Sequence, residues 1–273
     1  MTKDVLETNQ LCSFRDPSAR VVVTSGRVLR VATGPEGQSI KEFLESRLAE
    51  ALEAEGKLVH TRLCDRADAG SLVWEHERVP FPSYPYEWPP EMLHSAAELT
   101  VELARRALPE GYGLKDATPC NVLFRGPRPV FVDVASFERR DLRDPVWLAY
   151  AQFVRTFLLP LAADKYLGIT PADVFINHRD GLSPEAVHAM LPAARKLHPF
   201  FLEWVTLPAL ISRTGAARSG GIYRPRRSTD SEQARFTLEV HLKRFERALR
   251  RVAPDSGRKS AWSDYPATAA HYD

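Results

Sequence analysis

The segment LKDATPCNVLF, residues 114–124, constrains the fold of this chain more than any other stretch. It spaces Asp116 and Asn121 as Asp-x-x-x-x-Asn within one loop, and Pro119 between them stiffens the turn. A short charged turn and the apolar run PVFVD, residues 129–133, follow, and this pattern predicts a β-hairpin. We expect the hairpin to carry Asp133, at the end of its second strand, back beside the loop.

Two carboxylates and an amide in this order suit phosphoryl transfer from ATP. That reaction needs one carboxylate near the acceptor hydroxyl and oxygen ligands that hold magnesium against the phosphates. We interpret Asp116 as the base, and Asn121 and Asp133 as the magnesium ligands. An isolated D-x-x-x-x-N is also typical of a surface turn with an Asx cap. The predicted hairpin that follows the loop favours the catalytic interpretation.

The order D-x-x-P-x-N, apolar strand and Asp resembles that of protein kinases and of aminoglycoside and choline kinases. The resemblance implies an α+β, two-lobed protein-kinase-like fold, with a small N-terminal antiparallel sheet, one helix and a larger, mainly α C-terminal lobe. It also implies ATP and magnesium as cofactors and a small-molecule hydroxyl as the acceptor.

The first part of the chain has the pattern of a sheet with one helix. Apolar residues recur at helical spacing from a capping box at 39–42 to Gly56, which predicts a single amphipathic helix. Short β-rich runs predict a hairpin before this helix and two strands after it, at residues 20–23, 28–32, 58–63 and 71–79.

Five prolines between residues 79 and 90 forbid regular structure, and a hinge between two lobes should lie there. Helical patterns then dominate, at residues 91–108, 146–166 and 183–197 and in a late helix marked by Phe236, Leu242, Phe245, Leu249 and Val252. We therefore expect an N-lobe at 1–80, a hinge at 81–90, a C-lobe with the catalytic loop at 91–253 and an exit linker at 254–273.

The residues that should hold the nucleotide depart from an ordinary kinase. Where a glycine-rich loop should cover the phosphates, residues 13–19 contain no glycine, and we expect a turn there that approaches phosphate less closely. Arg30 stands where a lysine is expected and can clamp phosphates with a planar head. Glu45 on the following helix could pair with Arg30, the alternative being an ordinary surface glutamate. These departures motivate a second hypothesis, a kinase-like scaffold without catalysis.

A closer resemblance covers almost the whole chain and is carried by SFRDPS at 13–18, YPYEW at 84–88, LKDATPCN at 114–121 and PVFVDVASFE at 129–138. These segments resemble the kinase-like, aminoglycoside-phosphotransferase-like N-terminal region of bacterial class I S-adenosylmethionine-dependent methyltransferases, including nodulation-protein-like members. The resemblance implies a module that works beside a methyltransferase domain or protein. No glycine-rich methyl-donor motif is recognised, so the methyltransferase domain itself is expected to be absent from these residues.

Composition limits the remaining classes of function. A formal net charge of +2 gives no global field that favours nucleic acid or an acidic membrane, and no stretch approaches the length of a membrane span. The three cysteines show no C-x-x-C pairing, which argues against a disulfide framework and a zinc site. These features predict a cytoplasmic protein. A third hypothesis, an RNA-binding module built on the basic segment 213–251, rests on local charge alone.

Overall fold

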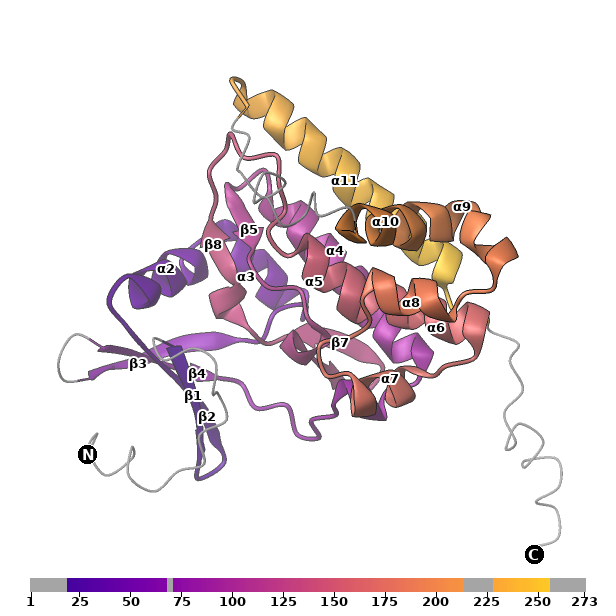
Figure 1. Ribbon diagram of the computed structural model, residues 1–273. Helices are drawn as coiled ribbons and strands as arrows, with labels where there is room; N and C mark the ends of the chain where they lie inside the picture. Colours follow the sequence, from indigo (N-terminus) through magenta and orange to yellow (C-terminus); the bar gives the residue numbers. More distant parts are fainter. Residues whose placement is uncertain (1–18, 68–70, 214–227, 256–273) are drawn as a thin grey trace, which may run out of the picture.

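The computed structural model describes residues 19–67, 71–213 and 228–255 (Figure 1). Outside these ranges lie residues 13–18 of the predicted phosphate-covering turn at 13–19, residues 214–227 of the basic segment and residues 256–273 of the expected linker.

A four-stranded antiparallel sheet forms the N-terminal part of the fold, with strand order β1-β2-β4-β3. The β1–β2 turn contains Ser25 at φ 47° and Gly26 at φ 81°. Two successive residues in the left-handed region match the right-handed twist of the flanking strands, so the predicted hairpin is confirmed. The strands are β1 (Ala19–Thr24), β2 (Arg27–Thr33), β3 (Thr61–Ala67) and β4 (Ser71–His76).

Two helices follow β2 where one was predicted: α2 (Gly34–Leu44) and α3 (Arg47–Ala54). Ser39 lies inside α2 and not at its start, so the predicted capping box is wrong. Ser46 separates the helices, because its hydroxyl accepts the Ala49 N–H at 3.2 Å and caps α3. The apolar stripe nevertheless runs across the break, and its buried members include Ile40, Phe43, Leu48 and Leu52.

Two short ladders join the sheet to the helical part. The predicted hairpin is β6 (Val122–Arg125) and β7 (Arg128–Phe131), and a second ladder pairs β5 (Tyr112–Leu114) with β8 (Phe137–Arg139). Phe43 of α2 stacks on Phe137 of β8 with a centroid distance of 4.0 Å, and Phe131 meets Phe137 edge-on at 5.7 Å. The N-terminal helix and both ladders therefore share one core.

Helices make up most of the remaining described chain (Figure 1). The helix predicted at 91–108 matches α4, whereas that predicted at 146–166 begins only at Tyr150 and contains a π-helical turn, Val154–Leu158. The helix predicted at 183–197 stops at Met190, before a 3-10 turn at Ala193–Leu197. Phe236, one of the residues that marked the last helix in the sequence, is 67% exposed.

These helices are α4 (Pro90–Ala107), α5 (Tyr150–Phe153), α6 (Leu159–Leu167), α7 (Pro171–Asn177), α8 (Pro184–Met190), α9 (Pro199–Phe201), α10 (Leu207–Arg213) and α11 (Ser231–Val252). The predicted order, an antiparallel sheet first and a mainly helical part second, is confirmed as an α+β fold. No helix in the described ranges combines the length and apolar character that a membrane crossing requires.

Candidate functional site

The loop and the hairpin place Asn121 and Asp133 side by side through the backbone. Asn121 ends a 3-10 turn, Pro119–Asn121, which begins after Thr118. Asp133 lies two residues beyond the end of β7, and the N–H of the intervening Val132 donates to the Asn121 carbonyl at 2.8 Å. The end of the strand is therefore tied to the end of the loop, as the sequence predicted.

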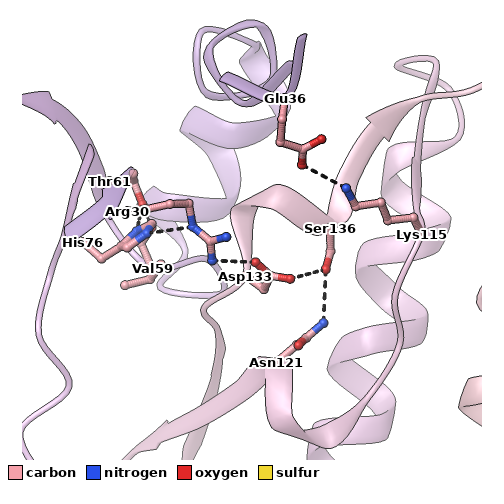
Figure 2. A network of polar contacts seen from close by, with 9 residues as sticks. All are labelled: Arg30, Glu36, Val59, Thr61, His76, Lys115, Asn121, Asp133 and Ser136. Atoms are coloured by element: carbon pink, nitrogen blue, oxygen red, sulfur yellow. Dashed lines mark hydrogen bonds and ion pairs between the residues drawn. The ribbon is translucent and has the colours of Figure 1, made fainter. Parts of the chain in front are cut away.

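Ser136 connects the two side chains. Its hydroxyl donates to Asp133 Oδ2 at 2.6 Å and accepts the Asn121 Nδ2 amide at 3.1 Å (Figure 2). The side chain reaches both partners because a 3-10 turn, Val134–Ser136, follows Asp133. Sequence reasoning missed Ser136, although its position three residues after the predicted metal ligand was a usable signal.

Arg30 approaches Asp133 from the sheet. Its Nη2 donates to Asp133 Oδ1 at 2.6 Å, and its side chain is only 9% exposed (Figure 2). The pair links β2 to the end of β7 across 103 positions of sequence. The structure thus brings together three of the predicted site residues, Arg30, Asn121 and Asp133.

A buried chain of hydrogen bonds through His76, Thr61 and the Val59 carbonyl, called the relay below, holds the guanidinium of Arg30 in place. Arg30 Nε donates to His76 Nε2 at 3.3 Å, and His76 Nδ1 lies 2.9 Å from Thr61 Oγ1, which donates to the Val59 carbonyl at 3.0 Å. Because Nε2 accepts, the ring proton is on Nδ1 and the imidazole is neutral. Burial lowers the pKa of His76 to about 3, and the positive charge of Arg30 acts in the same direction. Sequence reasoning did not identify His76 or Thr61.

A second ion pair crosses between the same two parts of the chain. Lys115 Nζ lies 2.9 Å from Glu36 Oε1, in the first turn of α2 (Figure 2). The Lys115 backbone N–H donates to the Ser136 carbonyl at 2.9 Å. Burial lowers the pKa of Lys115, but the hydrogen bond and the negative charge of Glu36 outweigh it, so the pKa is raised. Lys115 adjoins the predicted base in sequence, whereas nothing in the sequence marked Glu36.

Asp116 is half-buried and lies in a backbone that is held on both sides. On one side the Lys115 N–H donates to the Ser136 carbonyl, and on the other the Ala117 N–H donates to Gln152 Oε1 at 2.6 Å. Burial raises the pKa of Glu138, and the negative charge of Asp116 contributes to that increase. The predicted base therefore lies within electrostatic range of a second carboxyl.

Glu45 does not take the predicted place beside Arg30. It follows the last residue of α2, where its side chain is 66% exposed and 3.7 Å from Lys41. Arg30 pairs with Asp133 instead, so the expected Arg30–Glu45 pair is not formed. The reason is the break between α2 and α3, which leaves Glu45 at a helix end facing solvent. The alternative of a surface glutamate describes this residue.

The donor set around Asp133 has the chemistry that magnesium prefers. Magnesium is usually held by one or two carboxylates together with substrate phosphate oxygens and water, and Asp133 and Asn121 offer a carboxylate and an amide oxygen. The ranges that the structure describes contain no group of three or more His, Cys, Asp or Glu side chains that could hold a metal. The residues present fit an ion shared with a phosphate ligand.

Fold and site together define an α+β protein whose sheet and helical part meet at an Arg–Asp pair. No protein-family model matches the chain. The chain is similar to the nodulation protein NoeA of Rhizobium meliloti (strain 1021), with 31% identity over 272 residues, 93% of this chain and 54% of NoeA. It thus spans about half the length of that curated relative. The resemblance to nodulation proteins is confirmed, while the relation to methyltransferases stays a prediction.

Among solved structures, two kinases resemble the chain weakly. Vaccinia related kinase 3 has a TM-score of 0.39 at 9% identity and covers 87% of this chain and 88% of its own. The Cydia pomonella granulovirus kinase PK-1 has a TM-score of 0.34 at 11% identity and covers 50% of this chain and 57% of its own. Both scores are low, so the description of the fold rests on the chain's own elements.

Proposed function

We propose that this chain is a kinase-like phosphotransferase that binds Mg-ATP between its N-terminal sheet and its helical part, and transfers the γ-phosphoryl group to a small-molecule hydroxyl. One observation carries the proposal. Arg30, Asn121 and Asp133, which come from three separate segments, meet in one hydrogen-bonded network. The expected lobes at 1–80 and 91–253 and the hinge at 81–90 belong to the same proposal.

Each residue has a role in this mechanism. Asn121 and Asp133 would hold magnesium, and the ion would neutralise charge on the phosphates. Arg30 steadies the phosphate oxygens through its planar donors. Asp116 accepts the proton of the acceptor hydroxyl, in a backbone fixed on both sides. Most of the rate enhancement then comes from alignment and charge neutralisation.

The test is a calorimetric titration of the protein with a non-hydrolysable ATP analogue, with and without magnesium. The wild type should bind in a magnesium-dependent way, and Asp133→Asn should lose that dependence. Asp255→Asn is the matched control, since Asp255 pairs with Lys165 and not with any residue of the network. Absence of magnesium-dependent binding by the wild type would remove the catalytic proposal.

A second candidate is a kinase-like scaffold that presents substrate to a methyltransferase or regulates it. The observation that favours it is that both carboxylate oxygens of Asp133 already have partners within the chain, Arg30 and Ser136. The test compares Asp116→Asn with the wild type. Unchanged methylation by a co-purifying methyltransferase would favour the scaffold, and loss of ATP-dependent phosphoryl transfer would favour the enzyme.

A further inference from the structure

The Arg30–Asp133 contact is too close to be a loose surface pair. Arg30 Nη2 and Asp133 Oδ1 are 2.6 Å apart, and the Asp133 side chain is 24% exposed. Ser136 donates to the other carboxylate oxygen at 2.6 Å. A guanidinium at this distance offsets the negative charge of the Asp133 carboxylate and occupies Oδ1, an oxygen that a metal cation could otherwise bind.

The guanidinium cannot easily leave this position. His76 accepts from Arg30 Nε, and Thr61 fixes the ring that accepts, so strands β2, β3 and β4 each contribute to the relay. Figure 2 shows the Arg30 head reaching from the sheet between His76 and Asp133. A side chain whose rotamer is set by buried partners loses little entropy when it pairs, which strengthens the pair.

From this geometry, and on the basis of the proposed function, we propose that Arg30 acts as a built-in cation that competes with the divalent ion for Asp133. A divalent ion at Oδ1 and the guanidinium cannot share that oxygen without strong repulsion between like charges. The ion therefore binds only when Arg30 is displaced. Arg30 thereby sets the affinity of Asp133 for the metal ion. His76 is a positioning residue, because it holds the guanidinium of Arg30 beside Asp133.

The probe is Mn²⁺ alone, titrated into the full chain and followed by the relaxation of water protons. Arg30→Met should bind Mn²⁺ about tenfold tighter than the wild type or more, because a positive charge next to the carboxylate is gone. The matched control is Arg62→Met on β3, which removes the same charge from the same sheet but pairs with Glu75. It should bind like the wild type.

Two further variants test separately the position of Arg30 and the need for the Asp133 carboxylate. His76→Gln retains the charge of Arg30 but loosens its position, so its affinity for Mn²⁺ should lie between those of the wild type and Arg30→Met. This variant replaces Arg30→Met if the latter does not fold. Asp133→Asn should bind Mn²⁺ most weakly.

Equal affinities of the wild type, Arg30→Met and His76→Gln would overturn the competition, as would tight binding by Asp133→Asn. Failure of the proposed function gives a different result. In that case the ATP analogue binds none of the variants, while the order of Mn²⁺ affinities is unaffected.

Discussion

The candidate site has a hairpin side and a sheet side, and the two differ in how far apart in the sequence their residues lie. On the hairpin side, Asn121 and Asp133 are close in the chain, and one backbone hydrogen bond at the end of β7 aligns them. On the sheet side, Arg30, His76 and Thr61 come from three strands, and only the register of the sheet brings them together. Local spacing therefore places Asn121 and Asp133, the predicted oxygen ligands, whereas the packing of the sheet places the guanidinium of Arg30.

Substitution at the junction between the two sides should lower the free energy of unfolding more than any other change considered below. Phe137→Ala removes a fully buried ring that contacts Phe43 of α2 and Phe131 of β7, so we expect a loss of about 4 kcal/mol in the free energy of unfolding. Urea denaturation measures it. Phe236→Ala is the control, since that ring is mostly exposed and its removal should change stability by less than about 0.5 kcal/mol. Similar losses for both variants would contradict the shared core.

The hairpin side depends on one hydroxyl. Ser136→Ala removes the donor to Asp133 and the acceptor for Asn121, which should cost about 1–2 kcal/mol of stability because both groups are only partly exposed. Ser136→Thr keeps the hydroxyl and should recover part of the loss. Chemical denaturation of the three proteins provides the measurement, and an unchanged Ser136→Ala midpoint would count against the network.

The sheet side should carry a distinct pH dependence through His76. Its pKa is lowered to about 3 by burial, so below about pH 6.5 the unfolded chain binds a proton that the folded chain does not. This stabilising contribution is complete above pH 6.5 and falls as the pH drops toward 3, by at most about 1.4 kcal/mol per pH unit.

His76→Gln should lack that contribution. The measurement is the difference in unfolding free energy between the wild type and His76→Gln from about pH 7.5 to about pH 4.5, a range that spans the ordinary histidine pKa. Subtraction cancels the opposite trend of His94. Burial lowers the pKa of His94, but Glu98 and the Leu249 carbonyl together outweigh burial, so this pKa is raised. A difference that does not change with pH would show that His76 is not buried as a neutral ring.

Removing the helix cap at the break between α2 and α3 should have the smallest effect on stability. Ser46→Ala removes the cap of α3 and should cost about 1 kcal/mol, whereas Ser39→Ala, inside α2, should change stability by less than about 0.5 kcal/mol. Thermal unfolding of both variants distinguishes them. The reverse order would restore the capping box at Ser39 that the sequence suggested.

Much of the hairpin side followed from sequence because its signals are local. Asp133, Asn121 and the β6–β7 hairpin were all predicted from spacing and alternation within a short stretch. The sheet side was only half predicted: Arg30 was identified, but its partner was taken to be Glu45. That error arose because the apolar stripe continues across Ser46 and hides the break. Contacts such as Arg30–Asp133 and Lys115–Glu36 depend on how the sheet packs on the hairpin, which no local pattern encodes.

A double-mutant cycle on Arg30 and Asp133 tests whether the sheet and the hairpin are energetically coupled through this pair. The unfolding free energies of wild type, Arg30→Met, Asp133→Asn and the double variant give the coupling between the two side chains. We expect a favourable coupling of about 1–3 kcal/mol, because the guanidinium is buried and the two groups touch. A coupling near zero would contradict it.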